Sequence, residues 1–293
     1  MTSGWRTHRL QARVIQGFVV GVGLLVCVAP VVWTALAAVG IQPDNATSPP
    51  SWRIEPSIDH LVEVGVAEPA WQELATSVGV SFVAALLAAA ISFPAAYGMA
   101  RSGNSGSRPL VPGLLVLASL PVMAYVIPLS ALMQRLGLLD TLPGVTLAEA
   151  AATSPLAVFV FYGYLGAASR EFEEAARLDG ASLSRFLGSV VLPPAAPIIA
   201  ATIVVLFVLD WNQLLIPLVL TGINVRTLPV VLTDFFTLER ELDWPTAAAA
   251  LTISLVPVLI LVGLLHRVLD QFNLVGRGSR QRPAHAANSS LTV

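Results

Sequence analysis

Six stretches of the chain are each long and apolar enough to cross a lipid bilayer as a helix. The hydrocarbon core of a bilayer is ~30 Å thick, so a crossing helix needs ~20 predominantly apolar residues. Five stretches carry no Asp, Glu, Lys or Arg: residues 14–39, 76–100, 110–134, 150–169 and 245–266. The sixth, at about residues 195–220, carries one charge, Asp210. Because backbone groups in lipid must hydrogen-bond within the protein, the sequence predicts an all-α integral membrane protein with six transmembrane helices.

The first apolar stretch has an alternative interpretation as a secretory signal peptide. Arg6, Arg9 and Arg13 precede it, and Ala35-Leu36-Ala37 resembles a cleavage site. Its apolar run is longer than the about 7–15 residues of a signal peptide. The length therefore favours a helix that is retained in the mature protein.

The distribution of arginine predicts the orientation of the chain. All 16 basic residues are arginines, and if both termini are cytoplasmic, only Arg53, Arg135, Arg226 and Arg240 lie on the outer side. This bias follows the positive-inside rule, so both termini are expected in the cytoplasm. The expected organisation is a cytoplasmic stub over residues 1–13, a transmembrane domain over residues 14–275 and a flexible cytoplasmic tail over residues 276–293.

The same composition excludes several chemistries. A phosphate-binding P-loop requires a lysine, and the chain has none. Cys27 is the only cysteine, so no internal disulfide can form, and the four histidines do not have metal-ligand spacing. If ATP drives this protein, another chain must bind it.

The polar segment between the fourth and fifth apolar stretches, residues 170–197, predicts two short helices joined by a turn. Gly180 permits the turn because it has no Cβ, and the Ser182 hydroxyl can cap the second helix. Pro193 and Pro194 are expected to stop that helix. In the first helix, apolar residues at three- and four-residue spacing share one side: Phe172, Ala175, Ala176 and Leu178.

The charged residues of this first short helix are expected to face water or a basic partner groove: Glu171, Glu173, Glu174 and Arg177. Such a segment can dock a cytoplasmic partner. It can equally be an ordinary amphipathic connection that lies on the membrane surface.

Asp210 is the one carboxylate within the apolar stretches and is expected beyond the membrane midplane. A charge at that depth costs a few kcal/mol, so it should face the bundle interior or a wet cavity. One interpretation is substrate recognition, because a carboxylate can accept hydrogen bonds from sugar hydroxyls and Trp211 offers a flat apolar face. The other is a structural pair with an arginine or hydroxyl of a second subunit.

The polar segment contains three short motifs, Glu174-Ala175-Ala176, Asp179-Gly180-Ala181 and Leu192-Pro193. Together they resemble the EAA motif of the binding-protein-dependent ABC importer permeases of the carbohydrate, maltose-type family. The resemblance extends over most of the chain, through residues 94–101, 127–129, 136–141, 211–212, 217–218 and 227–230. One departure is Gln213, because the family usually has Glu after Trp211-Asn212.

The resemblance implies a permease subunit in a bacterial plasma membrane, with a cytoplasmic coupling helix between the fourth and fifth transmembrane helices. A second permease subunit would complete the path for a sugar or sugar derivative, two ATPase subunits would bind ATP and Mg, and an extracytoplasmic solute-binding protein would deliver the cargo. The chain itself would be neither an enzyme nor a cofactor protein, surrounded by membrane lipid and without a nucleic-acid partner. The implied ATPase-coupling residues are Glu174, Ala175, Ala176, Asp179, Gly180, Ala181, Leu192 and Pro193, and the substrate-path residues are Asp210, Trp211, Asn212 and Gln213.

Two other functions are weighed against this one. A self-sufficient secondary transporter or channel would more often show several intramembrane charges and paired broken helices, whereas the apolar stretches hold one Asp. An intramembrane enzyme needs a nucleophile with a base or a metal cluster, and the only histidine in these stretches is His266, at one end.

Overall fold

The computed structural model describes residues 4–44, 51–66, 68–102, 107–234 and 244–280. The chain divides into two compact units. The first combines Met1–Leu74 with Val231–Val256, and the second combines Ala75–Val230 with Pro257–Val293. Almost all described elements are helices, as the apolar stretches predict.

The first unit contains helix α1 (Gly4–Ala38), strands β1 (Ile41–Asp44) and β2 (Ser51–Ile54), and helix α2 (Asp59–Val66). It also holds most of α11 (Leu228–Asp234) and the start of α12 (Trp244–Arg280). Its small core joins α1, α2 and α12 through residues that are nearly all alanines: Ala37, Ala38, Val64, Ala248, Ala249 and Ala250.

The two strands are an exception to the predicted all-α fold. They pair antiparallel, with Ile41 opposite Ile54. Gly40 precedes β1 with φ +80°, and a Cβ there would meet the backbone oxygen of Glu55 at 2.4 Å. Only glycine fits this turn without displacing that backbone. The hairpin was missed because its segment is rich in proline and turn-forming residues.

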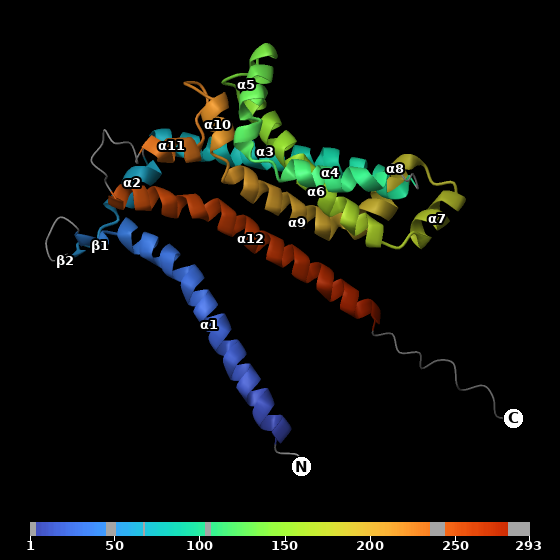
Figure 1. Ribbon diagram of the computed structural model, residues 1–293, viewed down its shortest axis with the longest axis horizontal. Helices are drawn as coiled ribbons and strands as arrows, with labels where there is room; N and C mark the ends of the chain where they lie inside the picture. Colours follow the sequence, from blue (N-terminus) through green and yellow to red (C-terminus); the bar gives the residue numbers. More distant parts are fainter. Residues whose placement is uncertain (1–3, 45–50, 67, 103–106, 235–243, 281–293) are drawn as a thin grey trace. The chain divides into compact units, whose positions relative to one another are not determined.

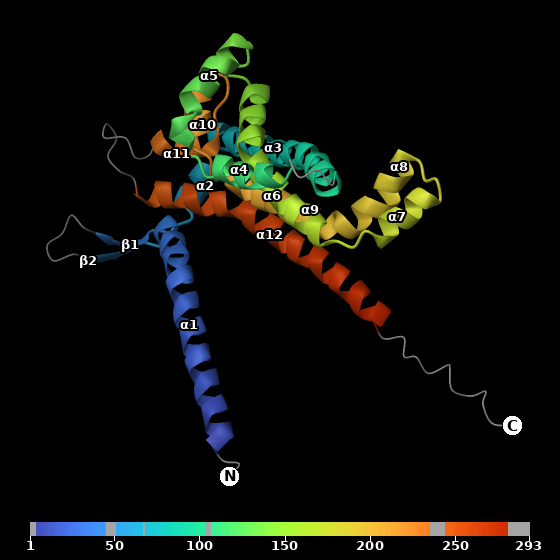
Figure 2. The ribbon, with the colours of Figure 1, turned by 45° about the vertical axis from the view of Figure 1, so that its right-hand side comes forward.

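The second unit is a helical bundle that places the candidate site. It is built from α3 (Glu68–Arg101), α4 (Ser107–Ala118), η1 (Val122–Ala124), α5 (Val126–Arg135), α6 (Leu142–Ala167), α7 (Glu171–Leu178), α8 (Leu183–Phe186), η2 (Leu187–Val191), α9 (Leu192–Trp211) and α10 (Leu215–Leu220). Helix α6 packs against α4 and α9, and α10 packs against α5 and α6. Both ribbon views place α7 and α8 at one end of α6 and α9, and α5 and α10 near the other end (Figures 1 and 2).

Five described helices are long and apolar enough to cross a membrane: Ile15–Ala38, Trp71–Arg101, Leu142–Ala167, Leu183–Trp211 and Trp244–Arg267. They correspond to five of the six predicted spans. The third predicted span, residues 110–134, is not one continuous helix. It breaks at Pro121, which is extended at φ −63° and ψ 136°, because proline lacks an N–H and disfavours helix at the residue before it.

Several predicted boundaries are corrected by the structure. The fourth span begins at Leu142 instead of residue 150, because Thr141 caps it by accepting a hydrogen bond from the Gly144 N–H at 3.2 Å. The fifth ends as a helix at Trp211, before the separate α10. Helix α1 already begins at Gly4 and α12 continues to Arg280. Residues 281–293 of the predicted tail lie outside the described residues.

Candidate functional site

Helices α7 and α8 form an angled elbow, here defined as residues 171–186, at one end of the second unit. Between them Gly180 has φ +71°, the left-handed conformation that glycine adopts without strain. The N–H groups of Asp179, Gly180 and Ala181 close the end of α7 onto Ala175, Arg177 and Ala176 carbonyls at 3.0–3.1 Å. Two short helices around a Gly180 turn are what the sequence predicts for this segment.

The elbow exposes its large apolar side chains. Phe172 and Leu178 on α7 are 77% and 89% exposed, and Leu183 on α8 is 73% exposed. Six of the eight predicted coupling residues lie on the elbow and are exposed or half-buried: Glu174, Ala175, Ala176, Asp179, Gly180 and Ala181. The elbow therefore carries exposed large apolar side chains as well as exposed carboxylates, Glu174 and Asp179.

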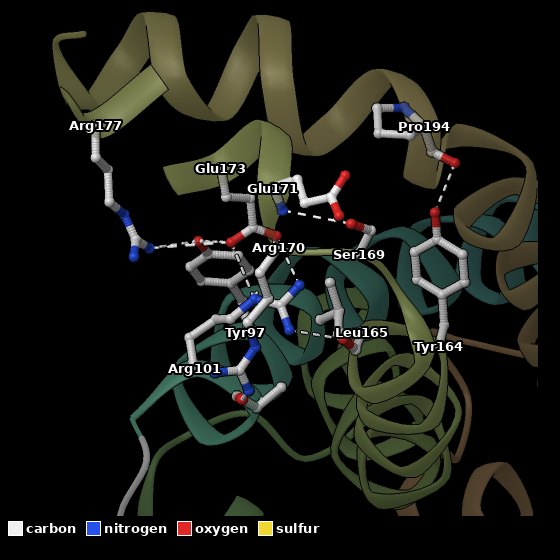
Figure 3. Close-up of polar contacts among 11 residues, drawn as sticks. Tyr97, Arg101, Tyr164, Leu165, Ser169, Arg170, Glu171, Glu173, Arg177 and Pro194 are labelled. Atoms are coloured by element: carbon white, nitrogen blue, oxygen red, sulfur yellow. Dashed lines mark hydrogen bonds and ion pairs between the residues drawn. The ribbon is translucent and has the colours of Figure 1, made fainter. Parts of the chain in front are cut away.

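Glu173 contradicts the expectation that the charged residues of α7 face water. It is buried and forms an ion pair with Arg101, the last residue of α3 (Figure 3). The side chains are 7% and 9% exposed, and the closest approach, Arg101 Nη2 to Glu173 Oε1, is 2.6 Å. This partner could not be predicted from local sequence patterns, because Arg101 lies 72 positions before Glu173 in the chain.

Arg101 and Glu173 meet in a two-pronged arrangement. Arg101 Nε donates to Oε2 of Glu173 at 2.9 Å, while Nη2 donates to Oε1. Arg101 Nη1 donates to the Leu165 carbonyl at 2.7 Å, and Tyr97 Oη donates to Glu173 Oε2 at 2.9 Å. Such paired, charge-assisted hydrogen bonds fix direction as well as distance.

The protonation of Glu173 follows from this environment. Burial by itself would raise the pKa of Glu173, but hydrogen bonds from Arg101 and Tyr97, with the charges of Arg101 and Arg177, lower it below its usual value. Arg177 also donates to Tyr97 Oη at 3.0 Å. The carboxylate is therefore held ionised within its cluster of donors.

The segment after the elbow differs from the prediction. Ser182 sits at the N-cap of α8 but makes no side-chain cap hydrogen bond. Pro193 and Pro194 do not stop the helix; they lie in the first turn of α9, which η2 joins to α8 without a break. Because these prolines have no N–H, the carbonyls four residues earlier lack α-helical donors, and Leu187–Val191 form a wider π-helical turn. Leu192 and Pro193 are exposed but lie outside the elbow.

A largely apolar cavity of about 610 Å³ lies between the elbow and the ends of α6 and α9. Its lining includes Tyr164, Phe172, Glu173, Val190 and Pro194. Tyr164 Oη spans one side of it by donating to the Pro194 carbonyl at 2.7 Å (Figure 3). The elbow is therefore attached to the bundle by specific polar contacts, with space remaining beside them.

The predicted substrate-path residues lie at the end of α9. Asp210 and Trp211 are buried, Trp211 stacks on Phe207 at 5.8 Å between ring centroids, Asn212 is exposed and Gln213 is half-buried. Asn212 Nδ2 donates to the Val208 carbonyl at 2.7 Å. The four predicted substrate-path residues are consecutive in the chain, but the structure does not direct all of their side chains to one surface.

Asp210 has a buried acidic neighbour that the sequence analysis missed. Glu149 on α6 is 1% exposed and Asp210 is 3% exposed. The two carboxyl groups interact electrostatically, and the Thr153 hydroxyl is within hydrogen-bonding reach of Asp210. Within the described residues, each has one carboxyl oxygen without a hydrogen-bond partner. Glu149 was overlooked because it directly precedes the stretch 150–169, although the capping residue Thr141 signals that the helix starts earlier.

At the far end of the bundle, Asp140 organises the loop after α10. Its carboxylate accepts hydrogen bonds from the backbone N–H groups of Gly222, Ile223, Asn224 and Val225 at 2.8–3.2 Å. These donors lower the pKa of Asp140 to about 2. Asp140 itself has φ +55°, a conformation in which aspartate is tolerated better than most residues.

Membrane-length helices, with a polar helical elbow attached to one end of their bundle, are the architecture of an integral membrane protein. A family model described as "binding-protein-dependent transport system inner membrane component" matches residues 90–273. The chain belongs to this family, which confirms the resemblance seen in its motifs.

Characterised relatives and a solved structure agree with this membership. The chain is 30% identical to the trehalose transport system permease protein SugB of Mycobacterium tuberculosis, over 66% of this chain and 72% of SugB. It is 27% identical to the trehalose/maltose transport system permease protein MalG of Thermococcus litoralis, over 84% and 89% of the two chains. Its fold matches a chain of a bacterial ABC transporter that imports the acidic polysaccharide alginate, with a TM-score of 0.71, 19% identity and coverage of 89% and 97%.

Proposed function

We propose that this chain is one permease subunit of an ABC importer for a sugar or sugar derivative. Family membership supports a place in the membrane-embedded part of such a system. The names of its relatives, which include trehalose and maltose permeases, favour a sugar as cargo. In this proposal the partner ATPase chains bind ATP and Mg, a second permease subunit completes the path, and a solute-binding protein delivers the sugar from outside.

The proposed topology keeps six crossings with both termini in the cytoplasm of a bacterial plasma membrane. The segment α4–η1–α5 makes the third crossing, bent at Pro121. The arginine distribution supports this orientation because twelve of the 16 arginines then face the cytoplasm. The elbow lies on the cytoplasmic side in this topology.

The elbow is the proposed docking element for the ATPase, and one observation carries this assignment. Phe172, Leu178 and Leu183 are each more than 70% exposed on an otherwise polar segment. Exposed large apolar side chains are typical of a protein–protein contact. Glu174 and Asp179 are exposed on the same elbow and can pair with basic groups of the partner. A lipid-facing role suits these carboxylates poorly.

The proposed mechanism is a rigid-body displacement. ATP-driven closure of the two ATPase subunits moves both elbows, and the attached helices rock between inward- and outward-facing arrangements. Asp210, Trp211, Asn212 and Gln213 are the proposed substrate-path residues on this chain. No chemistry on the sugar is required of any residue.

The experiment that tests this function is reconstitution into liposomes with a second permease, the ATPase and the binding protein. We expect ATP-dependent uptake of radiolabelled trehalose or maltose. Changing Leu178→Asp should reduce both uptake and co-purification of the ATPase by about tenfold, because an interface hot spot contributes roughly 1.4 kcal/mol or more. Leu136→Asp, at an exposed position at the other end of the bundle, should leave co-purification unchanged.

Uptake by the purified chain alone, without ATPase, would contradict the proposal and favour a self-sufficient secondary transporter. Leu178→Asp complexes that retain the ATPase and transport normally would remove the elbow from the docking surface.

A further inference from the structure

We infer that Arg101 and Glu173 are positioning residues that fasten the elbow to α3, so that displacement of the elbow moves α3 and α6 as one body. The inference rests on the proposed function, because it concerns how the docking element acts on the bundle. In this inference the C-terminal end of α3, which lies outside the elbow, fastens the elbow to the bundle.

The ion pair is built for direction as well as for attraction. Arg101 uses three nitrogens: Nε and Nη2 reach the carboxylate of Glu173, and Nη1 reaches the Leu165 carbonyl at 2.7 Å. One guanidinium thus joins the last residue of α3, the last turns of α6 and the first turn of α7. A planar guanidinium that is held at three points cannot swivel as a single-point contact can.

Aromatic side chains enclose this junction. Tyr97 donates to Glu173, and its ring lies 5.8 Å from the Arg101 guanidinium and 6.4 Å from the Phe186 ring. Arg177 lies over the Phe186 ring at 5.1 Å. Phe186 is the last residue of α8 and is buried. Both short helices of the elbow therefore contact the same end of α3.

A second bond supports the same connection. Arg170, immediately before α7, donates through Nη2 to the Ala100 carbonyl at 3.1 Å. This satisfies one of the carbonyls that a helix leaves free at its C-terminus. The end of α3 is therefore linked to the start of α7 by a second hydrogen bond, between Arg170 and Ala100, beside the Arg101–Glu173 pair.

The consequence concerns how motion enters the bundle. Without these contacts, α7 is tied to the bundle by its covalent links and by packing on α8 and η2. With them, a push on α7 also reaches α3, a rod of 31 residues in its membrane-length part and about 46 Å long at ~1.5 Å per residue. Buried charges that are paired on three sides resist rearrangement, because breaking them leaves a charge unpaired in a low-dielectric site.

The experiment compares four complexes in liposomes: wild type, Glu173→Gln, the double variant Arg101→Met/Glu173→Leu, and Glu63→Gln. Glu63 is a matched control because it is an exposed glutamate outside the elbow, on α2. The double variant separates folding from positioning, since replacing a buried ion pair with apolar residues of similar size is often neutral for stability. The measurements are ATPase co-purification, thermal midpoint, ATP hydrolysis, and uptake of trehalose or maltose per ATP hydrolysed.

We expect Glu173→Gln and the double variant to keep the ATPase bound and active while sugar uptake per ATP falls about fivefold or more, the lower range of typical coupling effects. The double variant should have a thermal midpoint near that of wild type, and Glu63→Gln should match wild type in every measurement. Such a loss of uptake per ATP at normal stability is not expected of a residue that serves folding alone.

Three outcomes would overturn the inference. A double variant with the wild-type uptake per ATP would show that the pair is not needed to transmit the motion of the elbow, and one that does not assemble would assign the pair to folding. Loss of ATPase co-purification in Glu173→Gln would assign Glu173 to the docking surface. Absence of ATP-dependent uptake in the wild-type complex would instead contradict the proposed function, so the two failures are distinguishable.

Discussion

Asp140 shows how one residue can fix a loop that lies more than 80 positions away. Its carboxylate gathers four backbone N–H groups and the side-chain amide of Asn224, Nδ2 to Oδ2 at 2.9 Å. The loop 222–225 is therefore held in one conformation although it contains no regular structure.

We predict that Asp140→Ala releases this loop. Amide hydrogen exchange at Gly222, Ile223, Asn224 and Val225 should accelerate about tenfold or more, because a charged acceptor makes stronger hydrogen bonds than a neutral one. Helix α6 amides serve as the internal reference. Unchanged exchange at all four loop positions would contradict the assignment.

The pH dependence of the loop 222–225 follows from the direction in which the pKa of Asp140 is shifted. The pKa of Asp140 is lowered from 3.8 to about 2 in the folded protein. Because the pKa is depressed, the ionised carboxylate of Asp140 stabilises the folded loop at pH values above the ordinary pKa of aspartate. This stabilisation is lost as the pH falls through about 2. Loop amides should therefore remain protected at pH 5 relative to the Asp140→Ala protein, and the difference should narrow between about pH 4 and pH 2.

Asp210 gives the second prediction at this scale. Asp210→Asn should lower sugar uptake about tenfold, the effect of losing roughly 1.4 kcal/mol of substrate interaction, while the complex still assembles. Co-purification of all subunits is the control. Uptake at the wild-type rate would contradict a substrate role and leave Asp210 as a structural partner of Glu149 and its surroundings.

At the scale of single elements, the elbow depends on the conformation of its turn. Gly180 has φ +71°, and a Cβ there would meet no atom within 4 Å. The cost of a side chain is therefore backbone strain rather than a clash, about 1–2 kcal/mol for a residue other than Gly, Asn or Asp.

We predict that Gly180→Val weakens ATPase co-purification and sugar uptake several-fold, whereas Gly180→Asn preserves most of both, because asparagine tolerates the left-handed conformation. The comparison keeps the position and varies the backbone preference. Equal behaviour of the two variants would show that the turn conformation does not matter for docking.

The helix from α8 to α9 shows the limit of reading prolines as stop signals. Pro193 and Pro194 lie within the continuous helix from α8 to α9, and the preceding π-helical turn accommodates their missing N–H groups. Pro121, by contrast, is extended after the end of α4 and interrupts the third predicted span. The same residue type therefore interrupts one helix and is accommodated within another, according to its position.

At the scale of the whole chain, family membership and the elbow together lead us to expect a subunit that functions only with its partner chains. Sugar uptake should require the ATPase, as stated above, and a truncation that removes the elbow should leave the apolar helices able to insert in a membrane. Insertion depends on the hydropathy of each span, whereas docking depends on the exposed elbow surface. These two properties are therefore separable by experiment.

The sequence by itself determined the membrane class, five of the helical spans and the position of the elbow, because hydropathy, glycine turns and short motifs are properties of neighbouring residues. Only the tertiary structure decided that Glu173 turns inward to Arg101, that Glu149 lies beside Asp210, and that Asp140 holds the loop 222–225. Each of these contacts joins residues at least 61 positions apart. Partners at that separation are selected by how the helices pack, which no local pattern encodes.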